Sequence, residues 1–186
     1  MNLGRYYRLR MVRIFGAPVS VHWSVLVATA VLAVSALRSP IYAIAAISSY
    51  LGILLVHETG HAFVARRLHL DVLSIKIGVI HGLCEYEAPE NTWDETLVSW
   101  GGVLAQVCVG VLVFLAVALL RPSKLGYAGP VVVFLGYINL MVAAVNLAPT
   151  PGLDGYKAWR IVPLVVQRIR AKRAASQIVG RAKNAR

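Results

Sequence analysis

Four stretches of this chain carry more consecutive apolar residues than a water-soluble domain normally has. A helix needs about 17–25 apolar residues to cross a hydrocarbon core that is about 30 Å thick. The stretches that meet this length are residues 21–37, 42–65, 98–120 and 131–147. Only helices and closed barrels satisfy their backbone groups in lipid, and continuous apolar runs favour helices. We therefore predict an all-α polytopic membrane protein with about four transmembrane helices.

The composition agrees with a membrane protein and excludes other classes. Of the 186 residues, 58% are hydrophobic and 15% are charged, and the formal net charge is +11. Soluble domains average about 45–50% apolar and about 25% charged residues. The apolar content excludes a disordered chain, and we expect no nucleic-acid partner despite the positive charge. The two cysteines, Cys84 and Cys108, are too few for a disulfide-stapled secreted module.

The distribution of lysine and arginine predicts the orientation. With a cytoplasmic N-terminus, sixteen of the nineteen basic residues fall on the cytoplasmic face and three on the outer face. Cytoplasmic loops carry an excess of Lys and Arg, so we predict a multi-pass protein with both termini in the cytoplasm. The loop after the second stretch alternates apolar and polar residues from Leu73 to Gly78 and from Leu83 to Tyr86. This period of two predicts a small membrane-associated β-hairpin within residues 72–88.

The C-terminal segment differs from the rest of the chain. Residues 167–186 contain seven basic residues and no acidic ones. A basic cytoplasmic segment beside a membrane attracts anionic lipid headgroups. We therefore predict a membrane-embedded core at residues 1–166 and a basic cytoplasmic tail at residues 167–186. We expect the tail to be partly disordered and to contact anionic lipid.

Two acidic residues stand apart from the other six, which all lie in the loop after the second stretch. They are Glu58 and Asp154. Glu58 lies in the sequence His57-Glu58-Thr59-Gly60-His61, inside an apolar stretch where a charged side chain is costly and usually functional. On a helix the two histidines share one face. This H-E-x-x-H arrangement is typical of zinc metalloproteases, with the histidines as ligands and the glutamate as general base.

A catalytic zinc site usually has three protein ligands and one open position, so one ligand is still needed. Asp154 is the best candidate. It lies in residues 146–155, where Pro149 and Pro151 break the helix. Asp154 and Gly155 fit the start of another helix, which leaves the carboxylate free to point back into the bundle. The predicted topology places this segment on the same side of the membrane as His57.

These two segments together resemble the site-2 protease family of intramembrane zinc metalloproteases. That family pairs an H-E-x-G-H motif in one transmembrane helix with an N-x-x-P-x-P-x-x-D-G motif in a later one. Both are present here, at residues 57–61 and 146–155, and the similarity extends over about residues 14–161. The chain departs from the family at Val103, where proline is frequent, and at Tyr156, where a second glycine is frequent. We expect a minimal core without a PDZ or CBS domain.

The resemblance implies roles for individual residues. His57, His61 and Asp154 would hold one zinc ion, and Glu58 would act as general base. The expected function is regulated intramembrane proteolysis, with a transmembrane protein as substrate, in a bacterial or archaeal cell membrane. Asn146 would contact the substrate carbonyl or oxyanion, although a hydrogen bond between helices accounts for this asparagine equally well. The sequence names neither the substrate nor a regulatory partner.

Two other functions stay open. A catalytically inactive relative would bind membrane proteins without cleaving them, although it would have no need to keep Glu58 and the three predicted ligands. A metal transporter would place polar residues on several helices. This chain has one strongly charged apolar stretch and no internal repeat, which argues against a transporter.

Overall fold

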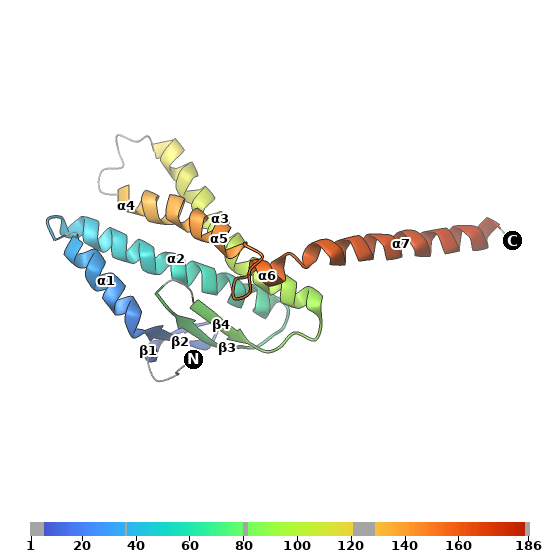
Figure 1. The fold of residues 1–186 in the computed structure, drawn as a ribbon, viewed down its shortest axis with the longest axis horizontal. Coiled ribbons are helices and arrows are strands. Elements are labelled where there is room, and N and C mark those ends of the chain that lie inside the picture. The colour runs from blue at the N-terminus through green and yellow to red at the C-terminus, as the bar shows by residue number, and fades with distance from the viewer. Residues whose placement is uncertain (1–5, 36, 80–81, 121–128, 185–186) are drawn as a thin grey trace.

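The computed structural model describes residues 6–35, 37–79, 82–120 and 129–184, which form a bundle of helices with a small sheet along one side (Figure 1). The strands are β1 (Tyr6–Ile14), β2 (Ala17–His22), β3 (Val72–Ile77) and β4 (Gly82–Tyr86). The helices are α1 (Trp23–Ser35), α2 (Pro40–Arg67), α3 (Thr92–Leu120), α4 (Gly129–Val131), the π-helical segment η4 (Val132–Ile138), α5 (Asn139–Asn146), α6 (Gly155–Ala158) and α7 (Ile161–Asn184).

Three helical segments of the described chain are long and apolar enough to cross a membrane. They are α2, α3 and the continuous run from α4 to α5, Gly129–Asn146. The apolar helix α1 has 13 residues, or about 20 Å at 1.5 Å per residue, which is shorter than a bilayer core. The expected span at residues 21–37 is therefore only partly helical, because Val21 belongs to β2. The prediction of four full spans is not confirmed.

The sheet has four strands in the order β1-β2-β3-β4. β3 and β4 pair antiparallel inside the segment where a hairpin is predicted, although residues 80–81 lie outside the described part of the chain. The sequence analysis did not predict β1 and β2, so the protein is mostly helical rather than all-α. β2 pairs with β3 in parallel, with Val19 opposite Ile75. A parallel pair needs a crossover connection, and the α1–α2 hairpin provides it.

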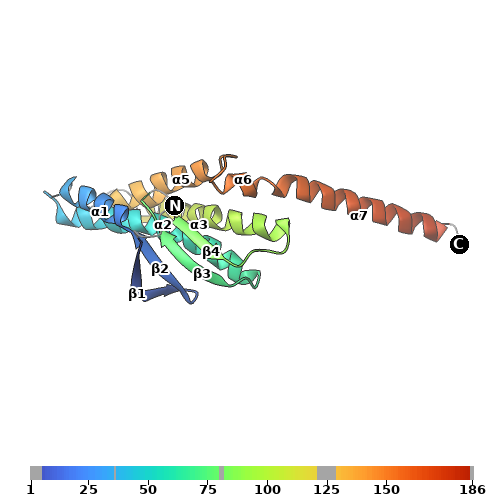
Figure 2. The same cartoon turned by 60° about the horizontal axis from the view of Figure 1, so that its bottom comes forward.

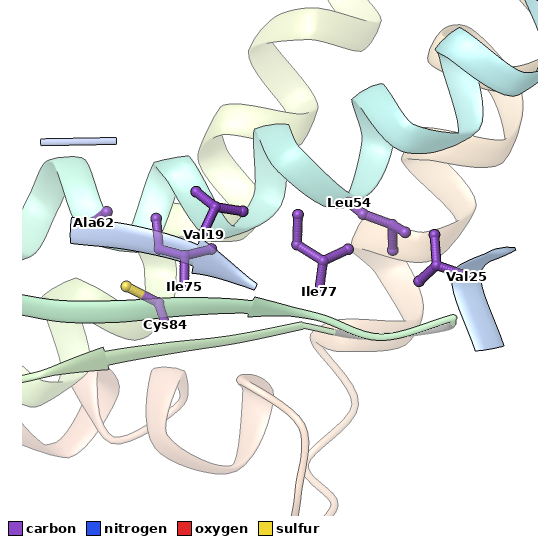
Figure 3. Close-up of a cluster of buried hydrophobic side chains, with 7 residues drawn as sticks. All are labelled: Val19, Val25, Leu54, Ala62, Ile75, Ile77 and Cys84. Carbon is purple, nitrogen blue, oxygen red and sulfur yellow. The ribbon is translucent and has the colours of Figure 1, made fainter. Parts of the chain in front are cut away.

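The sheet packs its apolar face on the second half of α2. Val19 from β2 and Ile75 and Ile77 from β3 are buried against Leu54 and Ala62 of α2 (Figure 3). The alternation of buried and exposed positions along β3 produces this one-sided face. As a result the sheet lies alongside the helical turns that carry the histidine motif.

The backbones of α2 and α3 approach closely where both helices carry glycine. A Cβ atom added to Gly60 would lie 2.3 Å from the Gly101 carbonyl oxygen, and one added to Gly101 would lie 2.6 Å from the Gly60 carbonyl oxygen. Small residues are what membrane helices use at such interfaces, because lipid supplies no hydrophobic force that would drive helices together. This contact fixes α3 against the histidine-bearing turns of α2.

Helix α7 extends away from the bundle, as Figures 1 and 2 both show. Near its start the Arg168 guanidinium lies 3.6 Å from the centre of the Trp93 ring, at the beginning of α3. The expectation of partial disorder in the tail is wrong for residues 167–184, which continue this helix. Residues 185–186 lie outside the described chain.

We expect Gly60→Ala to destabilise the protein by about 1–3 kcal/mol, because the added methyl group meets backbone atoms that no side-chain rotation can move away. Thermal unfolding in detergent measures the effect. Gly52→Ala on the same helix is the matched control, since its Cβ would meet only the Leu135 side chain at 3.4 Å. Equal stability of the two variants would contradict the close α2–α3 contact.

Candidate metal centre

Two imidazoles from α2 form the first half of the centre. His57 and His61 lie one helical turn apart, both are buried, and their Nε2 atoms are 3.1 Å apart. Residues at i and i+4 lie above one another on a helix, so the sequence spacing alone places both rings on the same face. Their ring planes are perpendicular, which brings the two Nε2 atoms toward a common point.

Asp154 supplies a third atom from a distant part of the chain. Its Oδ2 lies 3.0 Å from His57 Nε2 and 3.3 Å from His61 Nε2. Asp154 stands at the N-cap of α6, but its carboxylate makes no capping hydrogen bond. A Cβ on the following Gly155 would lie 2.2 Å from the Leu147 carbonyl oxygen. Glycine is therefore required for α6 to pack under the end of α5 and aim Asp154 at the histidines.

The outer ring nitrogens show which atoms face the centre. His61 Nδ1 lies 2.7 Å from the Val98 carbonyl oxygen, and His57 Nδ1 lies 2.9 Å from Gln106 Oε1. Both oxygens are acceptors, so each Nδ1 carries the proton and donates it. Each Nε2 then presents a lone pair to the carboxylate oxygen of Asp154. Three acceptor atoms thus converge, and they need a positive charge between them.

This geometry fits zinc. Zinc binds imidazole nitrogen and carboxylate oxygen at about 2.0–2.2 Å, which places the ligand atoms of a tetrahedral site roughly 3.3 Å apart. The three atoms of His57, His61 and Asp154 are separated by 3.0–3.3 Å. They are also the only group of this kind among the described histidine, cysteine and acidic side chains. The set leaves a fourth position open, as catalytic zinc sites do.

Two glycines shape the walls of the centre, and sequence analysis missed their importance. A Cβ on Gly102 of α3 would lie 2.6 Å from His61 Nε2 and 2.7 Å from His57 Cε1. A Cβ on Gly82, the first residue of β4, would lie 2.4 Å from Glu58 Oε1. The absence of side chains at Gly102 and Gly82 therefore gives room to the imidazoles and to Glu58. Gly102 directly precedes Val103, which the sequence analysis treated only as a departure from the family.

One cavity of about 650 Å³ contains every site residue that the sequence singles out. Its lining includes the five predicted residues His57, Glu58, His61, Asn146 and Asp154. Glu58 is 2% exposed, so this carboxylate is almost fully removed from solvent. All of β4, which is an edge strand of the sheet, lines the same cavity.

The strand that lines the cavity carries one fixed negative charge. Glu85 accepts hydrogen bonds from Lys76 and Ser74, and these bonds hold the pKa of its carboxyl below the usual range. Its neighbour Cys84 is buried, and burial together with the charges of Glu58 and Glu85 raises the pKa of the thiol to about 12. Cys84 is not among the side chains whose ligand atoms converge at the centre, which are His57, His61 and Asp154.

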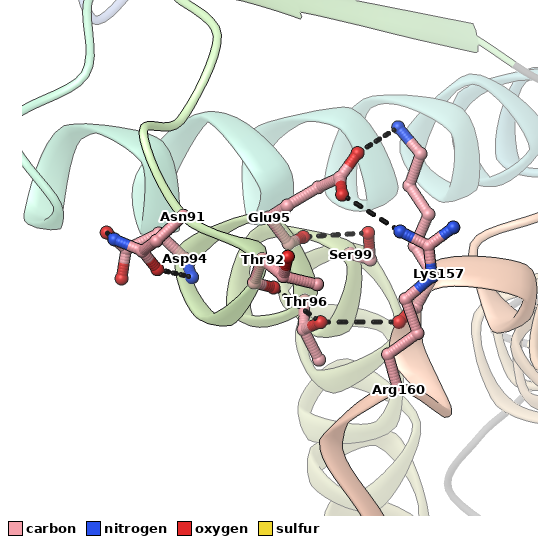
Figure 4. Close-up of polar contacts among 8 residues, drawn as sticks. All are labelled: Asn91, Thr92, Asp94, Glu95, Thr96, Ser99, Lys157 and Arg160. Carbon is pink, nitrogen blue, oxygen red and sulfur yellow. Dashed lines mark hydrogen bonds and ion pairs between the residues drawn. The ribbon is translucent and has the colours of Figure 1, made fainter. Parts of the chain in front are cut away.

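A set of polar contacts holds α6 on α3, the helix that carries Gly102 (Figure 4). Glu95 pairs with Lys157 at 2.9 Å and with Arg160 at 3.2 Å. Thr96 donates a hydrogen bond to the Lys157 carbonyl oxygen. Because Lys157 is three residues after Asp154, these contacts restrict the position of the third candidate ligand.

Comparison with known proteins places this site in context. A family model described as Peptidase family M50 matches residues 42–120, which include His57, Glu58 and His61 but not Asp154. Zinc metalloprotease MJ0392 of Methanocaldococcus jannaschii is 24% identical over 158 residues, covering 84% of this chain and 45% of that protein. Putative zinc metalloprotease Rip2 of Mycobacterium tuberculosis is 31% identical over 142 residues, covering 60% of this chain and 54% of that protein. The chain thus spans about half the length of these relatives.

A solved structure shares the fold. The site-2 protease from Methanocaldococcus jannaschii matches with a TM-score of 0.63 at 20% sequence identity, over 84% of this chain and 71% of that chain. The helical bundle with its flanking sheet is therefore a site-2 protease-like fold.

We expect Gly102→Ala to weaken zinc binding by about 10–100-fold, the range found when the surroundings of metal ligands are disturbed. The added methyl group would occupy the space beside both imidazoles. Metal analysis of the purified protein after dialysis against buffered zinc measures the loss. Gly52→Ala should keep the wild-type zinc content, and a Gly102→Ala protein with full zinc occupancy would contradict the assigned geometry.

Proposed function

We propose that the protein is an intramembrane zinc metalloprotease, a proposal that the match of residues 42–120 to the peptidase family M50 model supports. Its substrates are membrane-bound proteins, which it cleaves within or near their transmembrane segments. The observation that carries this proposal is the convergence of His57, His61 and Asp154 on one point, in the same cavity as Glu58, inside a bundle of apolar helices.

Each site residue has a different role in the proposed peptide hydrolysis. His57, His61 and Asp154 would hold a zinc ion, which would supply Lewis-acid chemistry to activate water and polarise the scissile carbonyl. Glu58 acts as general base: it accepts a proton from the attacking water and passes it to the leaving nitrogen as the C–N bond breaks. Asn146 lines the same cavity, where its side-chain amide donates a hydrogen bond to the oxygen of the substrate carbonyl.

The substrate binds in an extended conformation beside β4. A transmembrane helix hides its backbone in its own hydrogen bonds, so it must unwind locally before hydrolysis. β4 lines the cavity and is an edge of the sheet, so its outer backbone groups are available to pair with an added strand. Pairing with such an edge replaces the hydrogen bonds that the unwound helix loses.

The connection between β2 and β3 supports the predicted orientation. The chain leaves the sheet through α1 and returns to it through α2, so β2 and β3 lie on one side of the membrane. In this topology the metal centre and α7 lie toward the same side. That side also carries most of the basic residues, so we assign it to the cytoplasm. The Tyr50 hydroxyl donates a hydrogen bond to the Val79 carbonyl oxygen. Tyr50 lies about 24 Å along α2 from Arg66. This contact supports a sheet that follows α2 into the membrane.

We expect Glu58→Gln to abolish cleavage of a helical membrane substrate, with a loss of about 10²–10⁴-fold, while zinc content stays at the wild-type level. The amide keeps the size of the side chain but cannot accept the proton. Proteolysis in liposomes and metal analysis of the same preparation measure the two quantities.

Other outcomes of that experiment separate the alternatives. Undiminished cleavage by Glu58→Gln would overturn the assigned mechanism. Zinc binding without cleavage of any membrane substrate by the wild-type protein would favour an inactive, binding relative. Zinc flux across the liposome membrane that survives the substitution would favour a transporter.

The tail, residues 167–186, binds anionic lipid in this proposal. The start of α7 presents a stripe of exposed apolar side chains at the spacing of one helical face, namely Val162, Val165, Val166 and Ile169. The basic residues of the tail begin at Arg168, at the end of this stripe. An apolar stripe next to cationic residues is the pattern of helices that lie at an anionic membrane surface.

We expect a polarity-sensitive dye at Ser176→Cys, with Cys84 and Cys108 replaced by alanine, to report a less polar environment in phosphatidylglycerol vesicles than in phosphatidylcholine vesicles. Each basic residue near an anionic surface contributes about 1 kcal/mol. Alanine at the three bases that precede Ser176 most closely should remove the difference; these are Arg170, Lys172 and Arg173. The same spectrum in both lipids would contradict lipid binding by the tail.

A further inference from the structure

Gln106 is a fully buried amide in α3, the most apolar of the three described segments long enough to span a membrane. Its exposed fraction is 0%, and it lies in the middle of α3, where most neighbouring residues are apolar. A buried amide is costly unless its polar atoms find partners, so its contacts indicate why it is there. The side-chain oxygen of Gln106 lies 2.9 Å from Nδ1 of His57.

The helix geometry of α3 directs Gln106 to the metal centre. Gly102 and Gln106 are four residues apart and so lie on the same face of the helix. Gly102 leaves space for the two imidazoles, and one turn further Gln106 reaches the outer nitrogen of His57. The same face of the helix therefore both accommodates and orients the ligand.

The two histidines are held in different ways. His61 Nδ1 donates to the Val98 carbonyl oxygen, a backbone group that is independent of the residue type at position 98. His57 Nδ1 donates to a side chain, so the residue at position 106 decides its orientation. The acceptor fixes the proton on Nδ1 and leaves the Nε2 lone pair free for a metal.

The rest of the Gln106 side chain argues against a purely structural role. Its Nε2 is buried and has no hydrogen-bond partner within the described residues. The link between α3 and α5 uses the backbone instead, because Asn139 Nδ2 donates to the Gln106 carbonyl oxygen at 2.6 Å. A leucine or methionine at this position would keep that link and avoid burying an unpaired donor.

We propose that Gln106 is the positioning residue for His57: its side-chain oxygen fixes the tautomer and ring orientation with which His57 binds zinc. This inference rests on the zinc site proposed above. Gln106 itself touches neither the metal position nor the reacting atoms, and it acts only through His57.

The test compares two substitutions of Gln106 in the 186-residue chain in detergent. Gln106→Met has a similar length but no strong acceptor, whereas Gln106→Glu keeps one. Chelator competition measures the zinc dissociation constant, and thermal unfolding of the metal-free protein measures stability separately. We expect Gln106→Met to weaken zinc binding by about 10–100-fold without lowering the metal-free unfolding midpoint, and Gln106→Glu to stay within about threefold of wild type.

Asn139→Leu is the matched control, because it removes a buried interhelical hydrogen bond without touching His57. It should lower the metal-free unfolding midpoint and change zinc affinity by less than about threefold. The inference falls if Gln106→Met binds zinc as the wild type does, or if its weaker binding comes with an equal loss of metal-free stability. It also falls if Gln106→Glu or Asn139→Leu is as weak as Gln106→Met. A wild-type protein that binds no zinc would overturn the proposed function as well, whereas the other outcomes leave it standing.

Discussion

The close approach of α2 and α3 at their glycines is the constraint on which the rest of the structure depends. With Gly60 against Gly101, the two backbones come nearer than any side chain would allow. That distance places the Val98 carbonyl oxygen and the Gln106 side chain within hydrogen-bond reach of the two imidazoles. It also leaves the Gly102 surface free for the rings. A wider helix pair would separate the histidines from the groups that orient them.

The sequence predicts the local parts of the centre better than the distant ones. The i, i+4 spacing fixes His57 and His61 on one helix face, and Glu58 and Asp154 stand out as the two acids outside the loop that holds the other six. Gln106 was missed because a single amide has no spacing pattern. The feature that could have identified it is that Gln106 is the single amide in residues 98–120, an apolar stretch without charged residues.

The sheet was underestimated for a different reason. The sequence analysis predicted no element for residues 6–20, and β2 pairs with β3 more than fifty residues later. Alternation from Ala17 to His22 was visible, but no local rule indicates parallel pairing over that distance. The same oversight lengthened the first predicted span, since Val21 contributes to β2 rather than to α1. For the tail, the high charge suggested disorder, whereas alanine and the long basic side chains favour helix formation.

The parallel pairing of β2 with β3 also orders the assembly of the protein in time. β2 leaves the ribosome before either helix of the α1–α2 hairpin, and it has no parallel partner until that hairpin is complete and β3 has followed. The wall of the cavity that β4 forms is thus completed only after the first helices are in place. During synthesis, the candidate metal centre therefore stays incomplete until the α1–α2 hairpin beside it has formed.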